Sequence, residues 1–158
     1  WEKNRKKVQA VNDFAEGMMY EAFYIISGEE LAAGVFRGAK WGYNYVKHVR
    51  TTQRLQKHVN KAVKIVDNLG DEALTVRQYR AVQRNPNLRP MYRGNRIDVM
   101  TRNFVKNDAK LRHLKSNYTN GPDFVNPANN NWWDITTKAQ WQKHVDKYGP
   151  GGTLLRTN

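Results

Sequence analysis

Hydrophobic side chains recur at intervals of three and four residues over most of the first seventy positions, a spacing typical of helices that bury one face. The pattern stops at Ser27-Gly28 and again before Gly70, and both sites favour a break between helices. We therefore expect helices over residues 11–26, 31–49 and 55–66.

The pattern after residue 70 is mixed. Thr75 and Gln78 have the spacing of a capping box, which predicts a helix that ends at Asn85-Pro86. Pro90 then favours extended backbone. Residues 96–100 alternate polar and apolar side chains, which predicts a strand.

A β-hairpin is expected over residues 122–136. Phe124-Val125 and residues 132–136 have strand character, and nearly all of residues 126–131 between them are turn formers. Thr137 and Gln140 repeat the capping-box spacing.

That second box predicts a helix over residues 141–148, which the glycine-rich stretch 149–152 ends. Residues 153–155 predict a last short strand. Helices followed by strands with one helix between them indicate an α+β fold with an α/β core. We expect a helical segment over residues 1–70 and a second domain over residues 71–158.

Charge adds information about the partner. The chain has 27 Lys and Arg against 14 Asp and Glu, a net charge of +13. This excess favours a polyanion: nucleic acid, an acidic protein or a membrane surface. Residues 71–115 alone carry 11 basic and 4 acidic side chains. The arginines expected to hold a nucleic-acid backbone are Arg77, Arg80, Arg84, Arg93, Arg96 and Arg102; the alternative is a merely solvated helix face.

Several kinds of chemistry are excluded. Without cysteine the chain has no disulfide and no thiolate nucleophile or zinc ligand. It has no phosphate-binding glycine loop, dinucleotide fingerprint or serine elbow, and no apolar stretch of membrane-spanning length. The chain begins at Trp1 without an initiator methionine or a secretion signal, so we expect a fragment of a longer polypeptide.

Two carboxylates flank the expected hairpin. Asp123 lies at its first strand and Asp134 on its second, so both can face one side of the sheet and bind a hard cation such as Mg²⁺. Asp98, on the strand expected before them, is a candidate third acid. The alternative is that Asp123 and Asp134 cap turns or pair with arginines.

Two further candidates lie on the helix expected after the hairpin. Lys143 can orient an attacking water and stabilise the charge that develops on a phosphate. His144 can act as a general acid or base. The alternative for each is an ordinary surface residue.

Residues 121–124, 132–137 and 140–144 carry a family resemblance. They resemble the C-terminal nuclease domain of bacterial polymorphic toxins of contact-dependent growth inhibition, in the restriction-endonuclease-like PD-(D/E)XK superfamily. Pro122-Asp123 is similar to the "PD" of the motif, and Asp134-Ile135-Thr136 stands where (D/E)XK is expected. The resemblance covers about residues 92–157.

The resemblance implies a small restriction-endonuclease-like core with a mixed sheet, in which Asp123 and Asp134 bind magnesium or another divalent ion. Thr136 stands in the place of the motif lysine, so the resemblance implies that Lys143 replaces that lysine. Thr136 would hold a ligand or a metal-bound water. Glu72 and Asp98 compete for the acid that this superfamily often carries on its first helix.

The function so implied is a toxin nuclease that hydrolyses the phosphodiester bonds of transfer RNA, other RNA or DNA. It would be delivered as part of a larger secreted or cell-surface toxin, with residues 1–70 assisting delivery, and would act in the cytoplasm of the target cell. The producing cell would need an acidic immunity protein bound over the active face.

Three alternatives stay open. One is a metal-independent ribonuclease that uses His113 or His144 with Lys143 as acid and base, because the 2′-hydroxyl of RNA permits such chemistry. The second is a non-catalytic nucleic-acid-binding module. The third is a membrane-active toxin built on residues 10–50.

Overall fold

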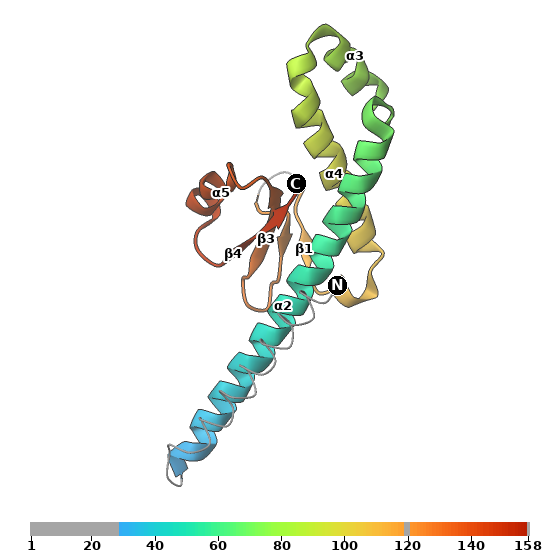
Figure 1. The fold of residues 1–158 in the computed structure, drawn as a ribbon. Coiled ribbons are helices and arrows are strands. Elements are labelled where there is room, and N and C mark those ends of the chain that lie inside the picture. The colour runs from blue at the N-terminus through green and yellow to red at the C-terminus, as the bar shows by residue number, and fades with distance from the viewer. Residues whose placement is uncertain (1–28, 119–120, 158) are drawn as a thin grey trace, which may run out of the picture. The chain divides into compact units, whose positions relative to one another are not determined.

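A computed structural model describes residues 29–118 and 121–157 of the chain (Figure 1). The chain divides into two compact units, Trp1–Arg50 and Thr51–Asn158. Helix α2 (Glu29–Leu69) is continuous from the first unit into the second. The helices predicted over residues 31–49 and 55–66 are therefore one helix, while the helix predicted over residues 11–26 lies outside the described residues.

The second unit is an α+β fold, as predicted. Its helices after α2 are η1 (Gly70–Ala73), α3 (Val76–Arg84), η2 (Pro86–Leu88), α4 (Arg89–Lys106), η3 (Ala109–Leu111) and α5 (Trp141–Tyr148). Its strands are β1 (Lys115–Ser116), β2 (Phe124–Val125), β3 (Trp132–Thr136) and β4 (Gly152–Arg156). Figure 1 shows α3 at the end of a helical arm that α2 and α4 form, away from the sheet.

The four strands form one mixed sheet in the order β1-β2-β3-β4. β1 pairs with β2, and β2 with β3, in antiparallel orientation, which confirms the predicted hairpin. β4 lies parallel to β3, with α5 as the connection between them. The two-residue strand β1 is too short to be recognised from the sequence.

One hydrophobic core joins α2 to α4 and the sheet. Leu55, Val59 and Ala62 of α2 are fully buried, at the spacing of one helix face. Val66 of α2 belongs to the same cluster, which also includes side chains from the other elements, namely Ala73, Ile97, Val105, Leu111, Phe124, Trp133 and Leu155. The domain boundary predicted at residue 70 coincides with the end of α2, but the compact second unit begins at Thr51 because this stripe belongs to its core.

The strand predicted over residues 96–100 is wrong, because this segment lies inside helix α4. Pro90 occupies the first turn of that helix, where no intrahelical hydrogen bond from its nitrogen is needed, so it begins a helix instead of extending the chain. Ile97, Thr101 and Val105 are buried at intervals of four residues. A five-residue alternation is too short to exclude this helical period.

The start of α5 also differs from the prediction. The capping box at Thr75 and Gln78 forms on α3, but the one predicted at Thr137 and Gln140 does not. The N-cap of α5 is Gln140, without a side-chain hydrogen bond, and its N–H donates to the carbonyl of Thr137 at 3.1 Å. The helix is held by ring packing on β3 instead.

This packing centres on Trp132. Its ring lies 5.3 Å from that of Trp141 and 5.6 Å from that of Tyr148, between ring centroids. Aromatic pairs at such separations stabilise beyond the area they bury. No helix among the described residues has the length and hydropathy needed to cross a membrane.

Gly152→Ala should destabilise the second unit. A Cβ at this position would lie 2.2 Å from the Trp132 ring, which is held by α5, so something must shift. Overpacking of this kind costs about 1–3 kcal/mol. Urea unfolding followed by tryptophan fluorescence measures the loss.

The matched control is Gly94→Ala. A Cβ there meets no atom within 4 Å, and Gly94 lies in the interior of α4, so alanine should raise the free energy of unfolding by about 0.5–1 kcal/mol. Equal effects of the two substitutions would contradict the close contact between Gly152 and Trp132.

Candidate active site

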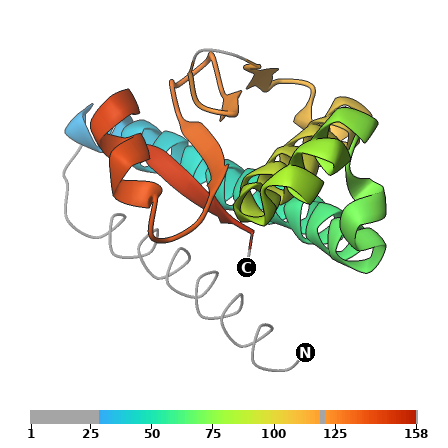
Figure 2. The ribbon, with the colours of Figure 1, turned by 90° about the horizontal axis from the view of Figure 1, so that it is seen from above.

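A cavity of about 600 Å³ lies where α4, the sheet and α5 meet. Seen from above, α4 and α5 lie on opposite sides of the strands (Figure 2). Most of the residues predicted to carry chemistry line this cavity. They are Asp98 and Arg102 of α4, Asp123 at the start of β2, Asp134 and Thr136 of β3, and His144 of α5.

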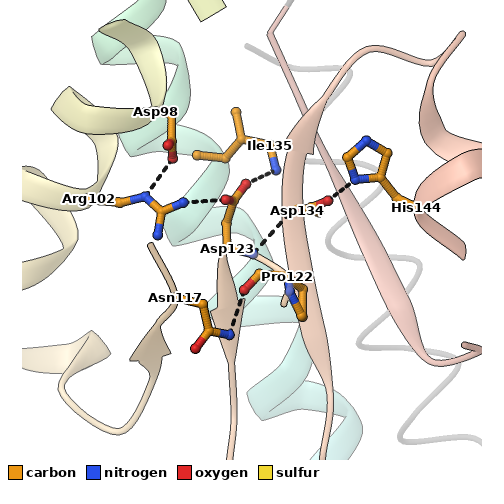
Figure 3. Close-up of polar contacts among 8 residues, drawn as sticks. All are labelled: Asp98, Arg102, Asn117, Pro122, Asp123, Asp134, Ile135 and His144. Atoms are coloured by element: carbon orange, nitrogen blue, oxygen red, sulfur yellow. Dashed lines mark hydrogen bonds and ion pairs between the residues drawn. The ribbon is translucent and has the colours of Figure 1, made fainter. Parts of the chain in front are cut away.

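The backbone before β2 fixes the position of Asp123. The N–H of Asn117 donates to the carbonyl of Asp123 at 3.0 Å, and its side-chain amide donates to the carbonyl of Pro122 at 2.8 Å (Figure 3). Phe124 is fully buried in the core. Since neighbouring side chains of a strand point to opposite faces, Asp123 is directed into the cavity.

The guanidinium of Arg102 ties α4 to β2. Its side chain is only 6% exposed. Its Nε donates to Asp98 at 2.7 Å, and its Nη2 donates to Asp123 (Figure 3). Its Nη1 is buried and has no hydrogen-bond partner. The exposed ring of Tyr118 lies 4.9 Å from the guanidinium carbon, a cation–π contact. Arg102 therefore has one buried donor nitrogen that finds no acceptor among the described residues.

Asp98 and Asp123 both contact this guanidinium, and Asp134 lies next to Asp123, so the pKa of Asp123 is shifted. Burial raises the pKa of Asp123 to about 8, and the charges of Asp134 and Asp98 act in the same direction. The N–H of Ile135, which donates to Asp123 at 2.7 Å, opposes the shift. Asp123 is consequently neutral at pH values at which an ordinary aspartate is ionised.

Asp134 and His144 form a dyad across β3 and α5. The Asp134 side chain is 5% exposed and accepts from His144 Nδ1, while the His144 ring is 31% exposed. The other oxygen of Asp134 accepts from the N–H of Asp123 at 2.9 Å (Figure 3). Because a carboxylate can only accept, the proton of the ring lies on Nδ1 and leaves Nε2 free to act as a base.

The Nε2 atom of His144 lies 3.5 Å from the hydroxyl of Thr136. Thr136 follows Asp134 by two residues on β3, so both side chains lie on the face of the sheet that α5 covers. A buried carboxylate that orients a histidine towards a hydroxyl is the usual arrangement of a general base. The dyad can accept a proton at the cavity surface.

The donor set does not fit a ready magnesium site. Each of the four oxygens of Asp123 and Asp134 already accepts from a protein N–H, supplied by Arg102, Ile135, the Asp123 backbone and His144. In the described part of the chain, no group of three or more acidic, histidine or cysteine side chains is arranged to hold a metal ion. The predicted alternative, in which these acids pair with arginine, fits Asp123 directly.

Other predicted residues lie away from the cavity. Lys143 is exposed and does not line it, because successive residues of a helix point about 100° apart and His144 takes the inward position. Glu72 of η1 and His113 do not line it either, whereas Asp98 does.

The six predicted arginines divide into groups. Arg93 and Arg102 line the cavity, and Arg93 makes a bidentate pair with Asp67 at 2.6 and 2.9 Å. Arg96 is partly buried on α4, outside the cavity lining. Arg77, Arg80 and Arg84 are exposed on α3.

Some cavity residues were not among the candidates. Gln140 and Tyr148 line the cavity four residues before and after the predicted candidate His144, so a polar stripe at this spacing was the signal that could have identified them. Tyr118 and Asn117 carry no such signal, since their place depends on how the segment before β2 meets α4.

The chain matches no protein-family model, no curated protein and no solved structure. Function is therefore inferred from the residues of the cavity themselves.

Asp123→Asn should flatten the pH dependence of stability. The folded state holds a proton on Asp123 up to pH of about 8, whereas the unfolded chain releases it near the ordinary value of 3.8. Folding thus takes up a proton between these values, and the free energy of unfolding should fall as pH rises, by up to about 1.4 kcal/mol per pH unit.

Urea unfolding at pH 5, 6.5 and 8 measures this slope, and the asparagine variant should lose it. Asp146→Asn is the control, because Asp146 is an exposed carboxylate of α5 that accepts from Gln142. An unchanged slope in Asp123→Asn would show that Asp123 is ionised throughout.

Proposed function

We propose that this chain cleaves phosphodiester bonds of RNA, with His144 as general base and Arg102 as the phosphate-binding group. The observation that carries the proposal is the Asp134–His144 dyad, which lines the same cavity as Arg102. A base and a guanidinium group around one cavity are what attack on a phosphate needs.

The reaction follows from these positions. His144 Nε2 takes the proton of a ribose 2′-hydroxyl, whose oxygen attacks the neighbouring phosphorus. The bond from phosphorus to the 5′-oxygen breaks, which leaves a cyclic phosphate and a free 5′-hydroxyl. Arg102 donates to a non-bridging oxygen as charge develops there. The neutral carboxyl of Asp123 is the group in the cavity that holds a proton for the leaving oxygen.

RNA is favoured over DNA because it brings its own nucleophile. With the oxygens of Asp123 and Asp134 already accepting from protein donors, water activation by a metal lacks a ready ligand pair. The 2′-hydroxyl removes the need for that step. Magnesium-dependent hydrolysis, the reaction that the resemblance implies, stays a prediction that chelation tests.

The biological setting stays a prediction as well. It depends on the resemblance of residues 121–144 to toxin nuclease domains of the PD-(D/E)XK superfamily. In that setting the chain is the delivered part of a larger toxin, acts in the cytoplasm of a competing bacterium, and is neutralised by an acidic immunity protein. The net charge of +13 supports both polyanionic partners, nucleic acid and immunity protein.

His144→Ala should lower the rate of RNA cleavage by about a hundredfold to ten-thousandfold, the usual contribution of a general base. Gel analysis of total cellular RNA incubated with the purified chain measures the loss. Lys143→Ala is the matched control on the neighbouring, exposed position and should retain activity. If Lys143→Ala is inactive and His144→Ala active, the lysine that the resemblance implies is the correct choice.

RNA cleavage should persist in EDTA, and plasmid DNA should remain intact with or without magnesium, because DNA lacks the 2′-hydroxyl. The products should carry cyclic phosphate ends, which mass spectrometry detects. Cleavage that needs magnesium and also acts on DNA would overturn the acid–base mechanism in favour of the metal nuclease. No cleavage of either polymer would favour the non-catalytic binding module.

A further inference from the structure

The exposed face of helix α3 carries three arginines with no counter-charge. Arg77, Arg80 and Arg84 are separated by three and four residues, so they form one stripe along the helix. None of them makes a hydrogen bond or ion pair with any residue that the structure describes. We call these three residues the α3 stripe.

The α3 stripe contrasts with the other arginines around it. Arg89 is paired with Asp71 at 2.8 and 2.9 Å, Arg93 with Asp67, and Arg102 with Asp98 and Asp123. Asp67, Asp71 and Asp98 thus serve other arginines, and the exposed Glu72 makes no ion pair with the α3 stripe. The positive charge of the α3 stripe is directed to solvent.

Apolar surface accompanies this charge. Val76 is 68% and Tyr79 45% exposed, whereas Val82, three residues after Tyr79 on the same side of α3, is almost completely buried. An exposed tyrosine ring on the same short helix as three arginines suits nucleic acid, because phosphates bind the arginines and bases or ribose rings stack on tyrosine.

The cavity extends towards this surface. Its α4 lining runs from Arg102 back to Pro90, twelve positions along the helix, which is about 18 Å at 1.5 Å per residue. Pro90 lies two residues after the end of η2, the short connection that follows α3. Figure 1 shows α3 at that end of α4. A chain of phosphates that enters the cavity can therefore continue along α4 to the α3 stripe.

We propose that the α3 stripe is a second nucleic-acid-binding surface, which holds the phosphate backbone of an RNA substrate away from the bond that is cleaved. The proposal rests on the proposed function for the identity of the polymer. It makes the chain selective for RNAs long enough to reach both the cavity and α3, because a dinucleotide occupies the cavity alone.

The test compares two triple variants of the full chain. The first, Arg77→Gln with Arg80→Gln and Arg84→Gln, removes the α3 stripe. The control is Lys106→Gln with Lys110→Gln and Arg112→Gln, which removes the same charge from exposed positions at the opposite end of α4 and in the following turn. Glutamine keeps helix propensity close to that of arginine, and circular dichroism checks that both variants fold.

Binding is measured by fluorescence anisotropy with a labelled RNA hairpin, in a His144→Ala background that prevents cleavage. Loss of the α3 stripe should weaken binding by at least about tenfold at physiological salt and lower the slope of log K against log salt by about 2 to 3. The control should change both quantities much less. Equal losses in the two variants would overturn the proposal and leave α3 for another partner, such as an acidic protein.

Cleavage provides the second readout, with histidine retained at position 144. The α3 variant should raise KM for the hairpin and leave kcat/KM for a dinucleotide unchanged. If kcat/KM falls equally for the hairpin and the dinucleotide, the substitutions act through the fold and the proposal is wrong. If no RNA is cleaved but the α3 variant alone loses hairpin binding, the proposed function fails and the second surface stands.

Discussion

The organisation of the cavity depends on a single buried cation surrounded by acids. Arg102 is 94% buried yet has two carboxylate partners, one on its own helix and one at the start of β2. A buried guanidinium is stable only with such partners, and a buried carboxylate beside it depends on the guanidinium in the same way. The contact therefore fixes the helix relative to the sheet. It does not involve Asp134, whose side-chain partner is His144 of α5.

Helix α5, which connects the parallel strands β3 and β4, supplies His144 as this partner. Ring packing of Trp141 and Tyr148 on Trp132 sets its rotation, and this rotation directs His144 instead of Lys143 into the cavity. The chemistry follows from this choice of one residue over its neighbour. A lysine can only donate hydrogen bonds there, whereas a histidine that donates from Nδ1 to a carboxylate leaves Nε2 as an acceptor.

Local signals in the sequence predicted what lies close in sequence. The run of turn formers over residues 126–131 identified the hairpin, and the hairpin brought Asp123 and Asp134 together as expected. Asp98 lines the same cavity, but it lies on helix α4 and not on the predicted strand. The helical spacing of the buried residues in α4 is apparent only once its packing partners are known. The role of Arg102 depends on where α4 crosses β2, and no spacing in the sequence encodes that crossing.

The end of β4 is fastened to α2 by Gln56, whose amide donates to the carbonyl of Arg156 at 2.8 Å and accepts from its N–H at 2.9 Å. One side chain thus satisfies the same two backbone groups that a neighbouring strand would, across 100 positions of the chain. The first helix and the last strand of the second unit consequently lie side by side, so the beginning and the end of this unit are close together in space. The unit is therefore suited to circular permutation, in which these two ends are linked and new termini are made, for instance in the exposed turn at residues 127–130, with the core contacts preserved.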